Sequence, residues 1–196
     1  MRRLVIVGQR ARPTADFLLD DLPGTSGRLD VLLRCLRAGL MVSHGLRRDT
    51  VVYLVLLGGA EPRTLRYSGS EARFLRPDER SAATLARKVL AVPAAGGGFS
   101  TVRPGIAVAA GGIETVRPEV TPGAVFVLDE AGDDVRGADL PPGDVTFFVG
   151  DHTGFTPEVR GFLASLGARP LRVGPVSVHA DDAVALLHNE LDRRAR

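Results

Sequence analysis

Short apolar runs alternate with amphipathic segments along most of the chain. The runs are rich in β-branched residues and are bounded by glycine, proline or aspartate, a pattern typical of buried strands. They are LVIV (4–7), VVYLVLL (51–57), VFVL (125–128) and TFFV (146–149), with LRV (171–173) as a weaker candidate. The spacing of these runs leaves room for a helix between most of them.

Four intervening segments have the composition or periodicity of helices. Leucines recur on one helical face in the first of them, and Thr156 and Pro157 suit the N-cap and the first helical position of the third. The four segments are 28–43, 79–91, 156–166 and 181–193. Strands that alternate with helices predict an α/β fold built on a parallel sheet.

Two segments rich in glycine, proline or aspartate are expected to be loops. Residues 92–105 read as a mobile lid or a linker, and residues 132–144 join two expected strands. The length of 196 residues suits one domain with a substantial core. No apolar run reaches the roughly 18–20 residues needed to span a bilayer, and Cys35 is the only cysteine. We therefore expect a cytoplasmic protein without a disulfide framework.

Charge is distributed unevenly between the two halves of the chain. Residues 1–98 carry 16 basic and 9 acidic side chains, whereas residues 99–196 carry 9 basic and 14 acidic ones. A basic half suggests a surface for a polyanion such as RNA. Lys88 is the only lysine among 25 basic residues, so codon bias in a GC-rich genome is the alternative explanation. That bias explains arginine in place of lysine but not the asymmetry.

Polar or glycine-rich loops follow three of the expected strands, at 128–132, 149–155 and 172–182. Ligands of open parallel sheets bind beyond the carboxyl ends of the strands. No G-x-G-x-x-G or P-loop pattern is present, and one cysteine with four histidines in no ligand spacing predicts no metal site. The pair Asp151–His152 suggests either an acid–base pair or a turn, and the turn is favoured.

Two further polar patches have both a structural and a functional interpretation. In the segment 20–30, Arg28 and Asp30 either begin a helix or form a carboxylate–guanidinium pair that faces a substrate. In the segment 73–80, the arginines either decorate a solvated loop or bind phosphates, for which guanidinium groups are well shaped.

Three segments together resemble a known family. They are DLPGTSGRLDVLLRCL (21–36), LRPDER (75–80), and GDHTGF with VGPVSVHADDAVALLHNELDR within 150–193. They resemble the archaeal-type tRNA (pseudouridine(54)-N1)-methyltransferases of the SPOUT class. The resemblance implies a single domain over 1–196 with a mostly parallel sheet, helices on both faces and a C-terminal trefoil knot. It also implies a homodimer that acts on tRNA with S-adenosyl-L-methionine.

The resemblance implies that the three strand-end loops hold the cofactor, within a knotted region at about 124–196. Leu128 would lie on the pocket floor, Gly150 would allow close approach of the backbone, and Ala183 would close the wall. The wrapping segment would comprise Leu171, Arg172, Val173, Gly174, Pro175, Val176 and Val178. Archaeal members have a cysteine where this chain has Ala183, so the resemblance implies chemistry without a thiol.

On the substrate side, the related ribosome-assembly pseudouridine N1-methyltransferases have an Arg-x-Asp motif that matches Arg28 and Asp30. Two arginines of those enzymes match Arg76 and Arg80, with Asp78 between them. Asp30 would act as base or hydrogen-bond partner, and Arg28 would orient it or stabilise a ring oxygen. Three alternatives remain: a structural ion pair at a helix start, a ribosomal RNA substrate, and a non-catalytic RNA-binding protein.

Overall fold

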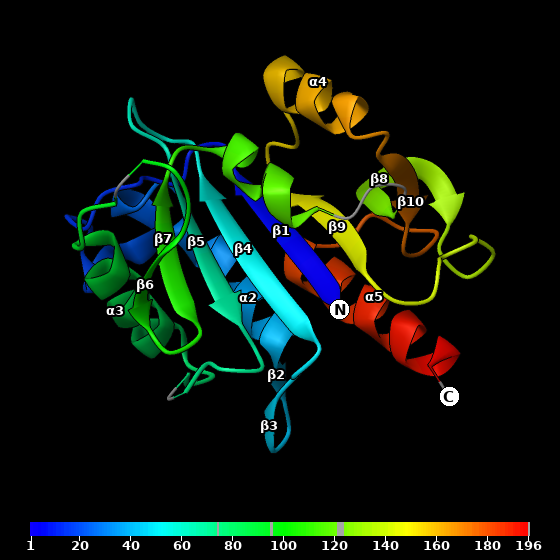
Figure 1. The fold of residues 1–196 in the computed structure, drawn as a ribbon, viewed down its shortest axis with the longest axis horizontal. Coiled ribbons are helices and arrows are strands. Elements are labelled where there is room, and N and C mark those ends of the chain that lie inside the picture. The colour runs from blue at the N-terminus through cyan, green and yellow to red at the C-terminus, as the bar shows by residue number, and fades with distance from the viewer. Residues whose placement is uncertain (74, 95, 121–123, 196) are drawn as a thin grey trace.

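A twisted sheet of eight strands runs through the computed structural model, which describes residues 1–73, 75–94, 96–120 and 124–195 (Figure 1). The sheet takes strands from both the basic and the acidic half of the chain. Phe74 in the 73–80 patch, Ala95 in the 92–105 segment and Arg196 at the end of the expected domain lie outside the described residues.

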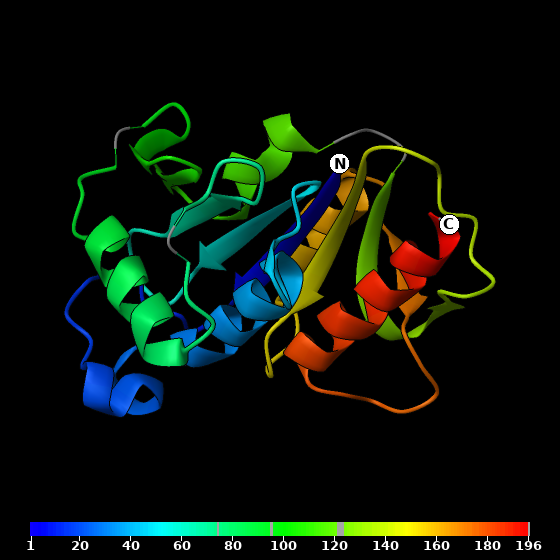
Figure 2. The ribbon, with the colours of Figure 1, turned by 90° about the horizontal axis from the view of Figure 1, so that it is seen from below.

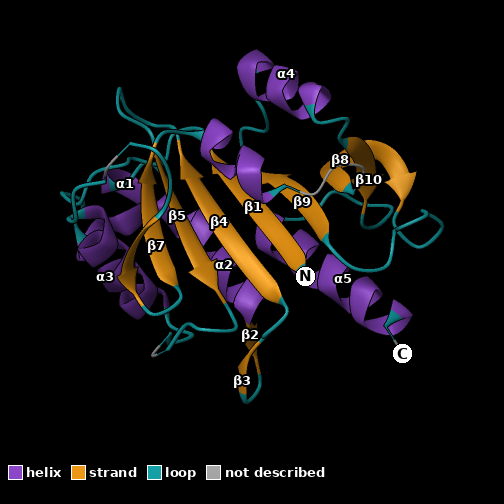
Figure 3. Cartoon of the chain, in the orientation of Figure 1, coloured by secondary structure: helices purple, strands orange, loops and turns teal. Residues whose placement is uncertain are grey.

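Strands and helices alternate only in part, because strands follow one another directly from β2 to β5, from β6 to β7 and from β8 to β9 (Figure 3). The strands are β1 (Arg2–Gly8), β2 (Met41–Val42), β3 (Gly45–Leu46), β4 (Thr50–Leu56), β5 (Arg63–Ser68), β6 (Ser100–Arg103), β7 (Ile106–Ala110), β8 (Val125–Asp134), β9 (Val145–Gly150) and β10 (Arg169–Arg172). The helices are η1 (Leu19–Asp21), α1 (Leu22–Thr25), α2 (Leu29–Leu40), α3 (Glu79–Leu90), η2 (Ile113–Glu119), α4 (Pro157–Ser165) and α5 (Ala180–Arg194).

The strand order in the large sheet is β10-β8-β9-β1-β4-β5-β7-β6. The five strands from β10 to β4 are mutually parallel, and β5, β7 and β6 extend the sheet with antiparallel pairings. The parallel part confirms the predicted fold class. The expectation that 92–105 is only a loop is wrong, because β6 occupies its last residues and pairs with β7. Pairing with a neighbouring strand stabilises this segment, and the local sequence does not show that pairing.

Helices cover both faces of the sheet, as predicted. Figure 2 shows α2, α3 and α5 in one layer, with α4 and η2 on the opposite face. The leucines of α2 are buried in the larger core, together with Val184 and Leu187 of α5. The apolar faces of the first and last long helices therefore pack inside one chain. These faces are therefore not available for a dimer surface, and the homodimer stays a prediction.

Local signals account for where α4 begins. The Thr156 hydroxyl accepts a hydrogen bond from the backbone N–H of Val159 at 3.5 Å, and Pro157 occupies the first turn, where its missing N–H costs nothing. Both features were predicted from the sequence. They set the length of the loop between β9 and α4, which is one of the three strand-end loops.

The edge of the parallel sheet formed by β10 contains an irregularity in its pairing with β8. Pro170 pairs with Val127, but the next residue, Leu171, pairs with Asp133, so residues 128–132 have no partner on β10. Gly132 is needed here, because a Cβ atom at this position would lie 2.5 Å from the backbone N of Leu171. Residues 128–132, which were expected to be a loop at the end of a strand, therefore form an irregularity inside β8. The trefoil knot that the resemblance implies stays a prediction.

Candidate functional site

The beginning of α2 has an unusual backbone. Arg28, the N-cap residue, has a φ angle of 71°, and among the described residues it is the one non-glycine with positive φ. The buried Ser26 hydroxyl accepts the N–H of Leu29 at 3.0 Å and donates to the carbonyl of Leu22 at 2.6 Å. The Ser26 hydroxyl thus satisfies a backbone N–H at the start of α2. Left-handed backbone at a bulky residue costs free energy and occurs most often at functional sites.

That backbone places Arg28 beside Asp30. The Arg28 Nε and Nη2 atoms donate to the two carboxylate oxygens of Asp30 at 3.0 and 3.1 Å. Arg34, one turn further along α2, donates from Nη1 to Asp30 Oδ2 at 3.0 Å. Asp30 is buried, whereas both guanidinium groups are partly exposed. Two cations thus share one buried anion at the start of a helix.

The pKa of Asp30 indicates what this carboxylate can do. Burial raises the pKa, but the hydrogen bonds from Arg28 and Arg34 outweigh burial and hold it below its ordinary value. Asp30 also raises the pKa of Arg28 through its hydrogen bonds and charge. A carboxylate with a lowered pKa and three donors is a poor proton acceptor at neutral pH. Of the two roles predicted for Asp30, the geometry favours hydrogen-bond partner over base.

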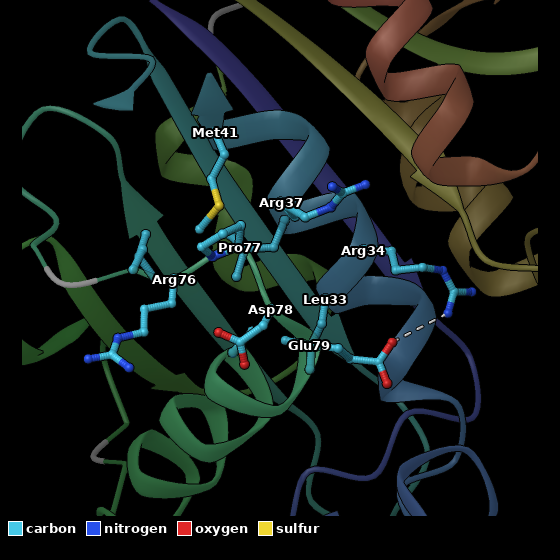
Figure 4. Close-up of a pocket in the computed structure, with 11 residues that line it drawn as sticks. Leu33, Arg34, Arg37, Met41, Arg76, Pro77, Asp78 and Glu79 are labelled. Atoms are coloured by element: carbon cyan, nitrogen blue, oxygen red, sulfur yellow. Dashed lines mark ion pairs between the residues drawn. The ribbon is translucent and has the colours of Figure 1, made fainter. Parts of the chain in front are cut away.

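The residues of the 73–80 patch lie at the start of α3, next to α2. The Asp78 carboxylate accepts the N–H of Ser81 at 2.8 Å and is therefore the N-cap of α3, and this hydrogen bond lowers its pKa. Arg80 forms an exposed ion pair with Asp20 at 2.6 Å. Arg76 lies at the edge of a groove between α2 and α3, and its guanidinium extends away from Arg34 (Figure 4). Asp78 has a structural role here, whereas Arg76 and Arg80 remain accessible.

The loop between β10 and α5, which we call the strap (residues 173–179), is exposed over most of its length. Residues 173–178 form no backbone–backbone hydrogen bond with another described residue. Val176 and Val178 are 70% and 41% exposed, which is unusual for valine. A Cβ atom added to Gly174 would have no neighbour within 4 Å.

Free backbone groups beside exposed apolar side chains fit a ligand that is part polar and part apolar. S-adenosyl-L-methionine, with its adenine, ribose and amino-acid parts, has this chemistry. The residues present therefore fit the cofactor that the resemblance implies, although its contacts with each residue stay a prediction.

The strap faces the segment 128–132. The Ser177 hydroxyl donates to the Glu130 carboxylate, and Arg172 donates from Nη1 to the carbonyl of Gly132 at 3.1 Å. Leu128 is half-buried against the larger core, and Leu171 is fully packed into it. Two of the three predicted cofactor loops are thus in contact.

The third loop follows β9 and is organised by Asp151. Its buried carboxylate accepts the N–H of Gln9 at 2.8 Å, and also the N–H and hydroxyl of Thr153 at 2.8 and 2.6 Å. A Cβ atom on Gly150 would lie 3.3 Å from the Cα of Gly154, so the loop itself uses the space that glycine provides. His152 is exposed. The structure therefore favours the turn interpretation of Asp151–His152.

One contact brings the substrate side to the cofactor side. The Arg34 Nε lies 3.8 Å from Oδ2 of Asp181, in the first turn of α5 and two residues before the buried Ala183. The sequence prediction missed Arg34 and Asp181. The spacing of four between Asp30 and Arg34 is a signal that identifies a helical ion pair.

In the described parts of the chain, no three side chains of the His, Cys, Asp and Glu types gather where they could hold a metal ion. The helices described include none that is both long and apolar enough to cross a membrane.

The sequence matches, over residues 1–195, the family described as "Putative SAM-dependent RNA methyltransferase". It is 42% identical over 194 residues to the tRNA (pseudouridine(54)-N(1))-methyltransferase of Methanosarcina acetivorans, covering 98% of this chain and 92% of that protein. The enzyme of the same name from Halobacterium salinarum is also 42% identical over 194 residues, with 98% and 96% covered.

Among solved structures, the chain is similar to Archaeoglobus fulgidus Nep1 bound to S-adenosylhomocysteine. The TM-score is 0.62 at 18% sequence identity, with 99% of each chain covered. At this identity the likeness establishes the fold, and it confirms the SPOUT-type architecture. From the family match and the curated relatives, this chain belongs to the family of S-adenosylmethionine-dependent RNA methyltransferases.

Proposed function

We propose that the protein methylates N1 of pseudouridine at position 54 in the TΨC loop of tRNA. The observation that carries the proposal is the meeting of Arg28, Asp30 and Arg34 with the cofactor loops at one end of the parallel sheet. Relatives about 40% identical over nearly the whole chain carry this activity in their names. Neither of these relatives is named for a ribosomal RNA substrate.

The chemistry needs little beyond positioning. When bound, S-adenosyl-L-methionine supplies a methyl group that is already activated. Pseudouridine has a free N1–H that uridine lacks, because the uracil ring is joined to the sugar through carbon. The protein has to hold N1 in line with the methyl group and stabilise negative charge that develops on the ring as the N1 proton leaves.

Arg28 is the residue we assign to that charge. Two of its guanidinium nitrogens bind Asp30, and the remaining N–H groups are available to a uracil oxygen. Asp30 acts as the positioning residue that holds Arg28, rather than as the base, because its pKa is lowered. The N1 proton then passes to solvent. Free backbone groups of the strap bind the cofactor, with Leu128 and Ala183 as apolar walls.

The basic half of the chain supplies the RNA surface. Arg76 and Arg80 lie at the start of α3, beside the groove next to Arg34, and bind phosphates of the TΨC arm. The exposed Arg80–Asp20 pair contributes little to stability and is readily exchanged for a phosphate contact. Binding should therefore weaken as salt concentration rises.

Methyl transfer from labelled S-adenosyl-L-methionine tests the proposal. tRNA transcripts should accept label after pseudouridylation and remain unlabelled without it. Label in transcripts that contain only uridine would contradict the N1 mechanism, because that nitrogen is then bonded to the sugar. Tight cofactor binding without transfer to either RNA would instead favour a non-catalytic RNA-binding protein.

A further inference from the structure

One guanidinium group faces carboxylates from three different helices. Arg34 of α2 lies 3.0 Å from Asp30 on its own helix. Its Nη1 is also 3.8 Å from Oε2 of Glu79 on α3, and its Nε is 3.8 Å from Oδ2 of Asp181 on α5. Figure 4 shows the approach of Arg34 to Glu79. Arg34 is thus the charged contact that α2 makes with both neighbouring helices.

The three contacts differ in kind. The distance to Asp30 is that of a hydrogen bond, whereas 3.8 Å is longer than the roughly 2.7–3.2 Å of an N–H···O bond. Arg34 therefore holds Asp30 and only approaches Glu79 and Asp181. The side chain is partly exposed, so it has room to close on either one. A planar guanidinium can bind two carboxylates at once, which the single ammonium of lysine does less well.

Each of the three helices carries a different part of the site. The start of α2 carries Arg28 and Asp30, and the start of α3 carries Arg80. The start of α5 follows the strap directly, so Asp181 is the second helical residue after the segment assigned to the cofactor. A ligand that fixes the strap also fixes the position of Asp181.

Resting on the proposed function, we propose that Arg34 couples cofactor binding to RNA binding. A cofactor seated on the strap holds Asp181 where its contact with Arg34 closes into a hydrogen bond. With this contact closed, Arg34 keeps its hydrogen bond to Asp30 in one orientation. Asp30 in turn holds Arg28 in the orientation that receives the pseudouridine. RNA binds more tightly to the cofactor-loaded protein. By linkage, the cofactor binds more tightly, by the same factor, to the RNA-loaded protein.

A binding cycle tests this coupling. The dissociation constant of pseudouridylated tRNA is measured by fluorescence anisotropy, with and without saturating S-adenosylhomocysteine, which lacks the transferable methyl group. In the wild type we expect the ratio of the constant without S-adenosylhomocysteine to the constant with it to be about five or more, within the usual range of allosteric coupling. Arg34→Gln and Asp181→Asn should each bring the ratio close to one, and the double variant should change it no further.

Two neighbouring residues provide matched controls. Arg37 lies one turn along α2 and Asp182 is adjacent to Asp181, and neither forms an ion pair with another described residue. Arg37→Gln and Asp182→Asn remove the same charges and should preserve the ratio. Arg34→Lys keeps the positive charge beside Asp30, so the protein should fold normally. The ratio should still fall close to one in this variant, which separates the loss of coupling from a folding defect.

The outcomes distinguish this inference from the proposed function. A wild-type ratio of one, or a full ratio in Arg34→Gln or Asp181→Asn, overturns the coupling while methyl transfer to pseudouridylated tRNA still supports the function. Weaker S-adenosylhomocysteine binding by Asp181→Asn but not by Arg34→Gln, measured without RNA, also overturns it, because Asp181 would then be a direct cofactor contact. A wild type that binds neither ligand contradicts the proposed function itself.

Discussion

Replacing Asp30 with asparagine removes the shared anion and keeps the shape of the side chain. Asp30 accepts three hydrogen bonds from two guanidinium groups. Asparagine offers one acceptor oxygen, and its amide N–H₂ faces guanidinium donors with which it cannot bond. The variant therefore loses most of the interactions that hold Arg28, while the packing of α2 is preserved.

The size of the effect follows from the number and exposure of these bonds. Hydrogen bonds to a charged group contribute roughly 1.5–3 kcal/mol each. The side chains of Arg28 and Arg34 are 40% and 37% exposed, so solvent screening reduces the sum. We expect Asp30→Asn to lower the free energy of unfolding by about 2–3 kcal/mol. If the same loss applies at the transition state, kcat/KM falls about 30- to 150-fold.

Two assays separate a positioning role for Asp30 from a role as base. The dissociation constant of S-adenosylhomocysteine should change little, while the rate of methyl transfer falls. The ratio of wild-type to variant rates should stay constant as the pH rises. If Asp30 were the base, higher pH would rescue the variant, because solvent would remove the N1 proton more readily. Full activity in Asp30→Asn would refute any functional role for this carboxylate.

The lowered pKa of Asp30 also predicts how this stabilisation depends on pH. A depressed folded-state pKa gives a contribution that is complete above the unfolded value of 3.8 and is lost as the pH falls through the folded value. The stability difference between wild type and Asp30→Asn, measured by chemical denaturation, should thus be constant from about pH 8 to pH 5. It should shrink only below about pH 4, and a difference that shrinks near pH 6 would contradict this account.

Five further substitutions test other parts of the molecule. Gly132→Ala places a Cβ atom 2.5 Å from the backbone of β10 and should lower the melting temperature by several degrees. Gly174→Ala meets no neighbouring atom, so this variant should fold normally and only its cofactor binding should weaken. Asp151→Asn should lower the free energy of unfolding by about 2 kcal/mol, because the amide that replaces the carboxylate faces a backbone N–H. The same substitution should weaken cofactor binding. His152→Ala should change neither quantity, and isothermal titration and denaturation measure the two. Burial lowers the pKa of His188 from 6.5 to about 4. The free energy of unfolding should therefore fall by about 2–3 kcal/mol as the pH falls from 6.5 to 4, because the unfolded chain binds the proton first. His188→Gln should flatten this pH dependence in thermal denaturation.

The strands and helices of the parallel half were predictable because they are locally encoded. The runs at 4–7, 51–57 and 146–149 are each bounded by a turn signal; the first and third lie within β1 and β9, and the second lies in β4 except for Leu57. The antiparallel extension was not predicted. Its strands β5, β6 and β7 depend on pairing with one another, and a periodic pattern does not reveal a non-local partner.

The candidate site was predicted in part. Arg28 and Asp30 were identified by resemblance, and the structure links them through Arg34 to Asp181, next to the predicted cofactor segment. Arg34 was missed because an arginine on a helix surface is usually solvated, and only the folded chain reveals Asp181 beside it. The pKa of Asp30 is lowered against the effect of burial by two guanidinium groups at once, and this favours the second of its two predicted roles, hydrogen-bond partner over base.

The central claim is that methyl transfer occurs at N1 of one pseudouridine in tRNA. The most direct test uses tRNA that contains pseudouridine at position 54 only or at position 55 only. After reaction with S-adenosyl-L-methionine, the tRNA is digested and each nucleoside is mapped by mass spectrometry. We predict N1-methylpseudouridine at position 54 of the first RNA and no methylated product from the second. Methylation at position 55, or at any atom other than N1, would contradict the account.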